Sequence, residues 1–411
     1  MRDGKGEQVR SRERRVDTGK TTLSVLFWTF LKIGATAFGG FMALISVVQN
    51  VVVERKKLLR HADMLDGVSL ASLLPGPVAV NLVAYVGYRL RGAPGALVAA
   101  AAVILPSFLL ILALSLAYFR YGQIPLVSKL FMGFVPAVAA IILAAAWAMG
   151  RQALGSVREV LLGVVAAGLL IGVGGFAVTL VIIVGAGLIG LVLFRNEPAR
   201  PRARGRKPRS AARDDDTPAG MRLFSLAAPL AAAPLLAVNA GALTALFLVF
   251  AGMSLMLFGG GYVFIPLIQE IVVDGRQWVT RQEFVDAIAM GQITPGPILI
   301  SAAFIGLKVG GLAGALVATV AIFAPPAVLM VIATRLLDRL QRSRAVQSAL
   351  RGVRAAVVGL IAAAAVTVAR TAALHWASLL IFAAVLVATL KWKIEVVWLI
   401  PAAGAAGLLL Y

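Results

Sequence analysis

The chain has no cysteine and only two histidines, His61 and His375, among its 411 residues. No disulfide or thiolate metal site can therefore form, and two distant histidines are too few to indicate a metal site. The full phosphate loop, a glycine followed by any four residues and then Gly-Lys-Ser/Thr, is also missing, which argues against an ATP-driven pump. Because no paired nucleophile and base stands out, we expect neither enzyme activity nor a cofactor.

Acidic residues are also few, whereas apolar residues are abundant. The chain has 18 Asp and Glu, is 60% hydrophobic and has a mean hydropathy of +0.93. Many apolar runs approach roughly 20 residues, which is enough to cross a hydrocarbon core of about 30 Å. We therefore expect an all-α, multi-pass membrane protein. No secretory signal peptide is expected, because the N-terminal segment is charged and the apolar stretch after it is too long.

The net charge of +21 is spread in a way that indicates lipid rather than nucleic acid. Basic residues gather in an N-terminal arm, in a central linker and at the ends of apolar segments. This is the pattern of cytoplasmic loops beside anionic lipid. Once the membrane segments are removed, no basic folded module remains, so we expect membrane lipid as a partner and no nucleic acid.

The tripeptide Pro-Gly-Pro occurs twice, at Pro75–Pro77 and at Pro295–Pro297. Each copy follows a glycine break, at 38–40 and at 258–261. One shift of 220 residues superposes both features and gives 11 identities within the 40 residues that begin at Phe38. Pro106 and Pro326 extend this register, and Arg151 matches Arg370 at a shift of 219. A duplicated half with helix breaks at matching places is typical of a secondary transporter.

The duplication divides the chain into four parts. Residues 1–20 form a basic arm, 21–194 the first membrane repeat, 195–220 a basic linker and 221–411 the second membrane repeat. The linker has the composition of a solvated tether, because it cannot form a core. We expect the N-terminus and the linker to lie on the cytoplasmic side of a bacterial inner membrane.

Each half should open with two broken helices. Thr21–Val53 would be about 50 Å long as one helix, and Gly39-Gly40 is its natural break. His61–Leu90 is divided by Pro-Gly-Pro into arms too short to cross alone. The broken helices are either re-entrant hairpins or discontinuous spans. Four plain spans should follow in the first half up to Phe194, and the second half has counterparts near Leu312–Leu337, Val346–Val368, Ala373–Leu390 and Ile394–Leu410.

Loop charge predicts that the two halves are inverted repeats. Glu54–Arg60 carries a net charge of +3, whereas the matching segment Asp274–Glu283 sums to zero. The bias reverses further on, because Arg339–Arg354 is rich in arginine where the first half is not. Under the positive-inside rule the halves then lie in opposite senses. An extra crossing at Leu223–Val238 would supply the inversion.

The backbone after each Pro-Gly-Pro is the expected substrate site. A helix that begins there offers free amides and the positive end of its dipole, which bind an anion without a cationic side chain. The alternative to a ligand site at the two Pro-Gly-Pro segments is a pair of proline kinks that bind nothing. The alternative function of the glycine breaks is close packing between helices. The expected substrate-binding residues are Lys32, Gly39, Gly40, Pro75, Gly76, Pro77, Val78, Ala79, Asn81, Gly259, Gly260, Gly261, Tyr262, Thr294, Pro295, Gly296, Pro297, Ile298, Leu299 and Ser301.

Charged residues near the breaks have two interpretations each. Lys32 lies within the first apolar segment, where it either faces a substrate path or reaches to the interface. Four acids at the hairpin mouths either bind protons for coupling or stabilise the first turn of a helix through its dipole. These acids are Asp63, Asp66, Glu283 and Asp286. Arg89 and Lys308 are expected to anchor the far ends of the second hairpins at the interface.

These motifs together resemble the chromate ion transporter family. The resemblance rests on Phe38–Gly40, Val53–Arg55, Leu74–Pro77, Phe258–Gly261, Trp278 and Pro295–Pro297, and it covers nearly all of both halves, as in a long, two-domain member. It implies export of chromate, with sulfate as the tetrahedral dianion that chromate mimics. The chain departs from the family pattern at three places. Residues 41–44 stand where proline and a nearby histidine are common. Tyr262 stands where histidine is common, and Asn81 where glutamine is common.

Three other functions stay open. These alternatives are a passive anion channel, a transporter of a different small anion, and a structural or lipid-binding membrane protein. Stoichiometric coupling to an ion would separate a transporter from a channel. The last class has no need of helix breaks near the midplane. The substrate, the direction of transport, the coupling ion and a homodimeric state are not determined by the sequence.

Overall fold

The computed structural model describes residues 22–38, 40–121, 125–173, 176–195, 240–257, 264–335, 343–370 and 375–411. All secondary structure in these ranges is helical. Several predictions lie outside them, namely the extra crossing at Leu223–Val238 and the site residues Gly39, Gly259, Gly260, Gly261 and Tyr262.

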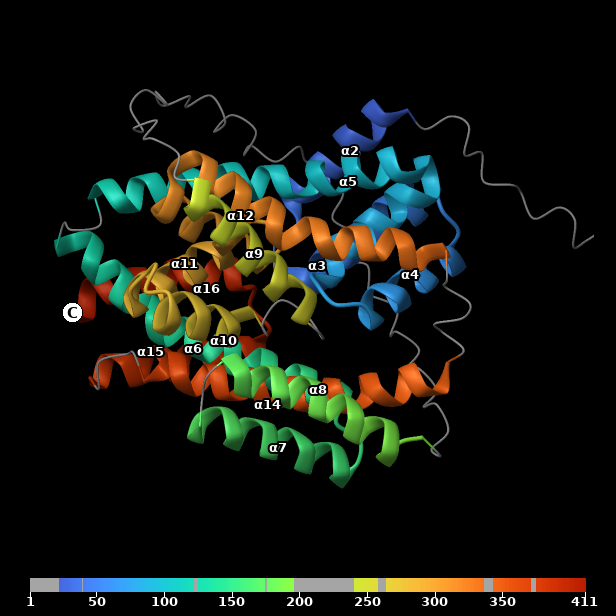
Figure 1. Cartoon of the computed structure of the whole chain (residues 1–411). Helices are drawn as coiled ribbons and strands as arrows, with labels where there is room; N and C mark the ends of the chain where they lie inside the picture. Colours follow the sequence, from blue (N-terminus) through green and yellow to red (C-terminus); the bar gives the residue numbers. More distant parts are fainter. Residues whose placement is uncertain are drawn as a thin grey trace, which may run out of the picture.

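The two halves have the same order of elements, which confirms the predicted duplication (Figure 1). The first half comprises α2 (Leu23–Thr36), α3 (Gly40–Gln49), the π-helical η1 (Asn50–Arg55), α4 (His61–Leu73), α5 (Val78–Tyr121), α6 (Pro125–Ala153), α7 (Val157–Gly172) and α8 (Phe176–Leu193). The second comprises α9 (Ala240–Met256), α10 (Phe264–Ile268), the π-helical η4 (Gln269–Gly275), α11 (Arg281–Ile293), the 3₁₀ turn η5 (Ile298–Ile300), α12 (Ser301–Arg335), α14 (Arg344–Ala369), α15 (Trp376–Val387), the π-helical η6 (Ala388–Trp392) and α16 (Val396–Leu410).

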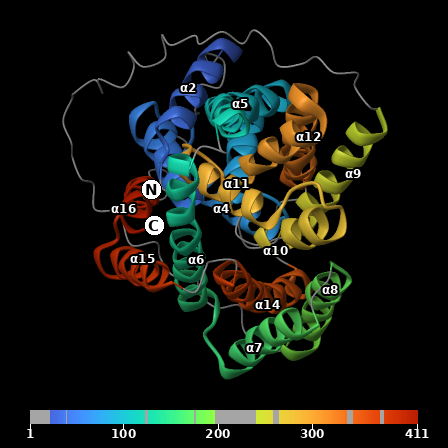
Figure 2. The same cartoon turned by 90° about the vertical axis from the view of Figure 1, so that its left-hand side faces the viewer.

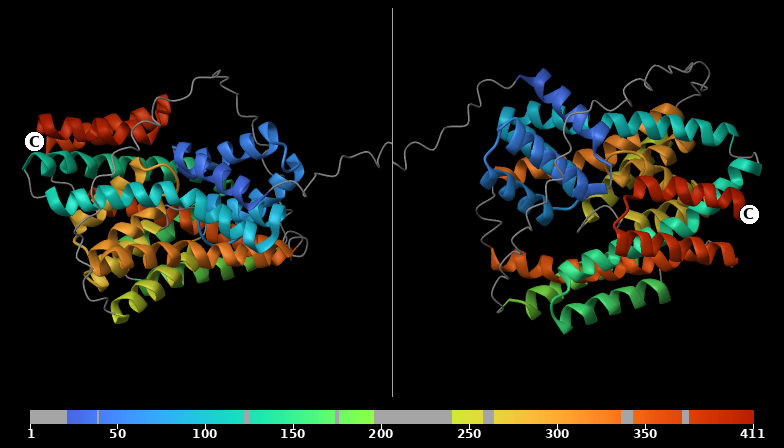
Figure 3. Two further views of the ribbon diagram at one scale, coloured as in Figure 1. Left: turned by 90° about the horizontal axis from the view of Figure 1, so that it is seen from above. Right: turned by 180° about the vertical axis from the view of Figure 1, so that it is seen from behind.

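Within the described ranges, four helices are long and apolar enough to cross a membrane. They cover Val78–Tyr121, Lys129–Arg151, Ile298–Arg335 and Arg344–Ala369. In both views of Figure 3 the long helices lie along one common direction, as expected for a membrane bundle. The two longest, α5 and α12, pack against each other, in the upper part of Figures 1 and 2.

The first broken helix of the first half folds back on itself. Helix α2 ends at Thr36, and the chain returns through α3 and η1. The ammonium group of Lys56, just after η1, donates a hydrogen bond to the Thr29 hydroxyl at 2.9 Å. Because Thr29 lies in the middle of α2, the returning arm runs beside the entering one, and the element is a re-entrant hairpin.

The second broken helix is also a re-entrant hairpin, closed at its mouth by an ion pair. Asp63 near the start of α4 pairs with Arg89 in α5 at 3.1 Å. In the second half Glu283 of α11 pairs in the same way with Lys308 of α12. We call these pairs the first mouth and the second mouth, and the turns Pro75–Pro77 and Pro295–Pro297 the first tip and the second tip. The expected position of the two basic residues at the interface stays a prediction, and the structure adds that they bind the acids across the hairpins.

Beyond each mouth the chain turns back once more. Helix α5 is interrupted at Arg91 and Gly92, and α12 at Gly310 and Gly311. A side chain at Gly87 would collide with the backbone of Gly95, although eight residues of straight helix would separate them by about 12 Å. Residues 93–121 and 312–335 then form a long arm in each half.

The interruptions show that the matching register changes by one residue. They lie 219 residues apart, not 220 as at the tips. The predicted match of Pro106 with Pro326 is therefore wrong, and Ser107 is the counterpart of Pro326. The short 3₁₀ turn η5 at the start of the second returning arm, absent from the first, accounts for the missing residue.

The long arms show that the two halves are inverted. The arm of α5 begins beside the first mouth and ends at Tyr118, whose hydroxyl bonds to Asp286 at the second mouth. The arm of α12 begins beside the second mouth and ends at Arg335, which bonds to Tyr88 at the first mouth. The mouths thus lie at opposite ends of helices roughly 40 Å long. Figure 1 shows α3 and α4 toward one end of the bundle and α10 and α11 toward the other.

The remaining helices place the basic segments on one side. The Ser348 hydroxyl near the start of α14 bonds to the carbonyl of Phe194 after α8, and Arg351 pairs with Glu159 at the start of α7. Helix α14 lies beside α7 and α8 in Figure 2. The first half therefore crosses four times, through α5, α6, α7 and α8, between two re-entrant hairpins and the linker. The start of α2, the end of α8, the end of α12 and the start of α14 all lie on the side of the first mouth.

Candidate functional site

Each Pro-Gly-Pro tip is a sharp turn that the local sequence requires. Leu74 and Thr294 have extended backbone after the helix, as expected for a residue before proline. Gly76 and Gly296 have φ of 103° and 105°, a region that residues with a Cβ rarely adopt. The second proline then precedes the helix that leads back to the mouth. The same three residues thus form the same turn twice.

The two tips bind reciprocally to the other half. The Gly76 amide donates to the carbonyl of Leu257, at the end of α9, at 2.6 Å. The Gly296 amide donates to the carbonyl of Ala37, at the end of α2, at 3.0 Å. Since Ala37 and Leu257 are equivalent in the duplication, the ends of all four broken helices converge at one place.

This place lies halfway along the long arms. The Ser107 hydroxyl, in the middle of the α5 arm, donates to the carbonyl of Pro295 in the second tip. A side chain added to Gly296 would overlap Ser107, and one added to Gly76 would overlap Pro326 in α12. Since each tip rests on the middle of the long arm of the opposite half, both tips lie near the centre of the membrane bundle.

Five backbone amides at the tips donate to no group in the described residues. In the first half these belong to Val78, Ala79 and Val80, and the next amide, of Asn81, bonds to the carbonyl of Pro77. In the second half they belong to Ile298 and Leu299. The amide of Ile300, expected to be free, donates to Pro297 at 3.1 Å because η5 is a 3₁₀ turn.

Two buried side chains beside the tips also have unused hydrogen-bonding groups. The Asn81 amide group donates to the carbonyl of Pro75 at 2.9 Å, but its oxygen Oδ1 has no partner among the described residues. Gln292, 8% exposed, has no described partner for its donor Nε2. Thr294 and Ser301 donate to carbonyls of their own tip, at Gly291 and Ile298. The sequence did not single out Gln292 as a binding residue, and the only signal was its position three residues before the second tip.

Lys32 does not lie on the face of α2 that packs against the protein. Leu26, Phe30 and Ile33 on that face are buried, whereas the Lys32 side chain is exposed. The ammonium group of Lys56, rather than that of Lys32, reaches back into this hairpin through Thr29.

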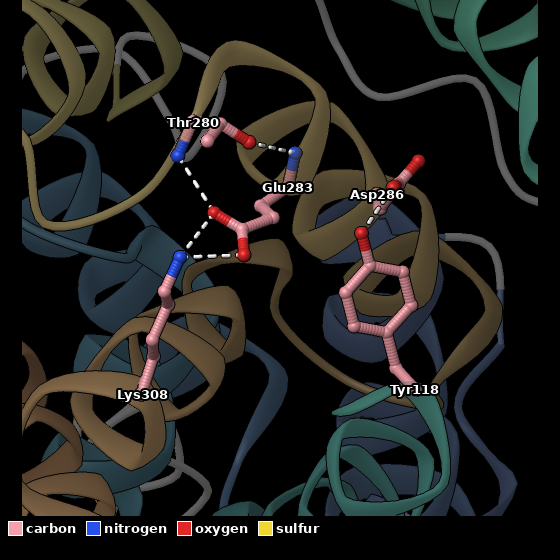
Figure 4. Close-up of polar contacts among 5 residues, drawn as sticks. All are labelled: Tyr118, Thr280, Glu283, Asp286 and Lys308. Atoms are coloured by element: carbon pink, nitrogen blue, oxygen red, sulfur yellow. Dashed lines mark hydrogen bonds and ion pairs between the residues drawn. The ribbon is translucent and has the colours of Figure 1, made fainter. Parts of the chain in front are cut away.

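The four acids at the mouths fall into different environments. Asp63 accepts from both Arg60 and Arg89, and the Arg60 guanidinium holds the pKa of Asp63 below its usual value. Glu283 caps α11 with Thr280 and pairs with Lys308 (Figure 4). Each of these two acids therefore stabilises the first turn of its helix and also forms an ion pair. Asp66, one turn into α4, is partly exposed.

Asp286 differs because its described partners are neutral. It is 1% exposed and accepts hydrogen bonds from the Tyr118 hydroxyl at 2.8 Å and from the Gln282 side chain at 2.9 Å (Figure 4). Burial raises the pKa of Asp286 to about 7. Its helix, α11, is a short re-entrant helix and does not span the membrane. Tyr118 was missed by sequence reasoning, since it lies 168 residues from its partner.

Inverted repeats whose broken helices meet at the centre of the bundle are an arrangement typical of membrane transporters. The family model described as chromate transporter matches residues 24–191 and 244–408. The chain belongs to the chromate transporter family.

Two relatives named as chromate transport proteins match over nearly the whole chain. A chromate transport protein of Cupriavidus metallidurans is 31% identical over 95% of this chain and 94% of its own length. A chromate transport protein of Pseudomonas aeruginosa is 32% identical over 94% and 92%. A shorter relative of Bacillus subtilis, the uncharacterized transporter YwrA, is 31% identical over 33% of this chain and 79% of its own length. No solved structure matches the chain.

Proposed function

We propose that the chain exports chromate, or a related tetrahedral oxyanion such as sulfate, across the bacterial inner membrane by secondary active transport. The observation that carries the proposal is the convergence of the two tips, with free amides at Val78, Ala79, Val80, Ile298 and Leu299. Amides at helix starts bind anions through their hydrogen bonds and the helix dipole. Membership of a family with relatives named as chromate transport proteins supports chromate as the substrate.

The composition of the tips suits an anion that must be released. The groups closest to them are backbone amides, hydroxyls and amide side chains, and no lysine or arginine belongs to either tip. Net-neutral donors hold a dianion without the strong attraction of a buried cation. The unused Nε2 of Gln292 would donate directly to an oxyanion, and the free amides between the first tip and Asn81 would donate from the opposite half.

Proton coupling is best supplied by Asp286. The two mouth acids Asp63 and Glu283 are held by basic partners, whereas Asp286 is buried with a hydroxyl and an amide. A buried carboxyl without a cation favours its protonated form and changes charge only when its surroundings open. Exchange of a proton for an outgoing dianion is therefore the coupling that we propose.

The first mouth is assigned to the cytoplasm. Phe194 at the end of α8, Arg335 at the end of α12 and the start of α14 lie on its side, and so do the charges of Glu54–Arg60. Cytoplasmic loops carry the excess of Lys and Arg. The same charge attracts the anionic lipids of the cytoplasmic leaflet.

Transport by protein reconstituted in vesicles tests the function. We expect chromate to be concentrated against its gradient when a pH gradient is imposed, with sulfate as a competitor. A passive channel would only equilibrate the anion, and a transporter of another anion would move neither. Asn81→Asp should strongly reduce chromate affinity because it puts a negative charge at the first tip. Asn81→Gln, which supplies the residue common in the family, is the matched control and should retain it.

A further inference from the structure

The two second hairpins differ in how they are covered. In α11 the residues Val285, Ala289 and Gln292 are 0%, 0% and 8% exposed. The equivalent residues of α4, 220 positions earlier, are Leu65, Ser69 and Ser72. Leu65 is 53% exposed, and both serines are partly exposed. One inverted copy is thus enclosed, whereas the other has an open face.

The neighbouring helices account for this difference. Helix α11 packs against α6 and α16. The equivalent helices in the inverted arrangement, α14 and α8, pack against each other as α6 and α16 do, and α14 also packs against α6 and α7. They do not cover α4 as α6 and α16 cover α11. The side-chain hydrogen bond that joins α14 to α4 comes from Arg354, whose Nη2 lies 3.4 Å from the carbonyl of Ser72.

The open face of α4 has the character of a surface in water. Asp66, Ser69 and Ser72 are spaced three residues apart and therefore lie on one side of the helix. Arg354 faces them from α14, ten residues after that helix begins at Arg344. Charged and polar side chains at such depth line aqueous paths rather than lipid. The face leads from the first mouth to Ser72, three residues before the first tip.

The charge along this face favours an anion. Arg60, Arg89 and Arg335 surround the first mouth, where Asp63 and Asp66 are the acids. Arg354 is the cation at the inner end, beside the tip, and its side chain is exposed. The carbonyl of Ser72 belongs to the last turn of α4, so Arg354 also complements the negative end of that helix.

We propose that α4 and α14 line a water-filled route that opens only on the side of the first mouth, and that Arg354 is the cation that attracts the oxyanion to the first tip. The proposal rests on the proposed anion transport and deepens it. Because the halves are inverted copies, exchange of their two arrangements would close this route and open the equivalent one along α11. A route open on one side at a time is also what separates a transporter from a channel.

Cysteine labelling tests the route without measuring transport. The chain has no cysteine, so single-cysteine variants have no background. We expect Ser69→Cys to react with a membrane-impermeant thiol reagent added from the first-mouth side. Ala289→Cys, at the equivalent position, should react much more slowly from either side. Equal labelling of both variants, or no labelling of a well-folded Ser69→Cys protein, would overturn the proposal.

The charge of the reagent tests Arg354. Ser69→Cys should react faster with an anionic than with a cationic methanethiosulfonate, by roughly tenfold after correction for their intrinsic rates. Adding Arg354→Gln should remove this preference, whereas Arg354→Lys should keep it. If Gln keeps the preference, Arg354 only caps α4 and the proposal fails for this residue.

Protection by ligand separates this inference from the proposed function. Sulfate, which does not oxidise thiols, should slow the labelling of Ser69→Cys in the presence of Arg354 and slow it less in Arg354→Gln. In one outcome, the protein still labels from one side and still prefers the anionic reagent, but sulfate gives no protection. This outcome would contradict the oxyanion substrate but support the route. Protection with equal labelling from both sides would contradict the route but support the substrate.

Discussion

The hydroxyl group of Tyr118, at the end of α5, donates a hydrogen bond to the carboxyl group of Asp286 in α11 at 2.8 Å. This bond joins the two halves at the second mouth. It also holds α11 in its enclosed position, because the long arm of one half ends against the re-entrant hairpin of the other. A carboxyl group at this contact couples its protonation to the packing of the two halves.

The stability of the protein should depend on pH through Asp286. Its pKa in the folded protein is about 7, against 3.8 as the reference value. Between these values the folded state holds a proton that the unfolded state has lost, so stability falls as pH rises from about 4 to 7 and is then level. We expect Asp286→Asn to flatten the fall in melting temperature between pH 5 and 8. Asp66→Asn, on the open face of α4, is the control, and an unchanged slope in Asp286→Asn would contradict the assignment.

The tips should not tolerate a side chain at their glycines. Gly76 has φ of 103°, and a methyl group there would overlap Pro326. Strain of this kind costs on the order of 1–3 kcal/mol before the overlap is counted. We expect Gly76→Ala to lower the melting temperature by several degrees and to abolish transport. Gly168→Ala, where a methyl group meets open space within a helix, should leave both unchanged. Wild-type behaviour of Gly76→Ala would show that the turn is not required.

The inverted arrangement predicts the sides from which two matching loops react. Arg55 follows α3 on the side of the first mouth, and Gln277 lies before α11 on the side of the second mouth. Both side chains are exposed. Arg55→Cys and Gln277→Cys should therefore react with an impermeant thiol reagent from opposite sides of the membrane. Reaction of both from the same side would rule out inverted repeats.

Much of this architecture was predictable, because it depends on local chemistry that repeats. Proline and glycine determine the two tips and the breaks wherever they occur, and hydropathy locates the spans. Duplication and loop charge together predict the inversion. The same reasoning could have found the mouth pairs, since Asp63 with Arg89 and Glu283 with Lys308 are equivalent in both halves.

Contacts between the halves were not predictable in this way. Ser107 and Tyr118 are ordinary residues of an apolar helix until the second tip and Asp286 are placed beside them. The change of register from 220 to 219 depends on one 3₁₀ turn. Arg354 was counted with the arginines that determine orientation, because its position within a helix and its bond to Ser72 depend on tertiary structure.

Lys32 remains a predicted contributor to anion affinity. Its side chain is exposed on α2, about one turn before the helix ends at Thr36, near the convergence of the tips. An exposed charge contributes up to about 1 kcal/mol, so Lys32→Met should raise the KM for chromate by roughly twofold to fivefold with little change in kcat. Lys56→Met, which removes the bond to Thr29, should instead lower the melting temperature. An unchanged KM in Lys32→Met would show that the lysine only reaches the interface.

The anion should be held by the free amides of the tips together with Gln292. Val78, Ala79 and Ile298 offer donors that bind nothing else in the described residues, and the buried Nε2 of Gln292 adds one more. A structure with bound chromate or sulfate should therefore show its oxygens about 2.7–3.2 Å from amides of at least one tip. Gln292→Leu should weaken binding by roughly tenfold or more, because a hydrogen bond to a charged group is worth about 1.5–3 kcal/mol. Gln292→Glu keeps the size of the side chain and adds a negative charge, so it should bind more weakly still. Anion density away from both tips, with Gln292→Leu unaffected, would reduce the two turns to kinks that only pack the hairpins together.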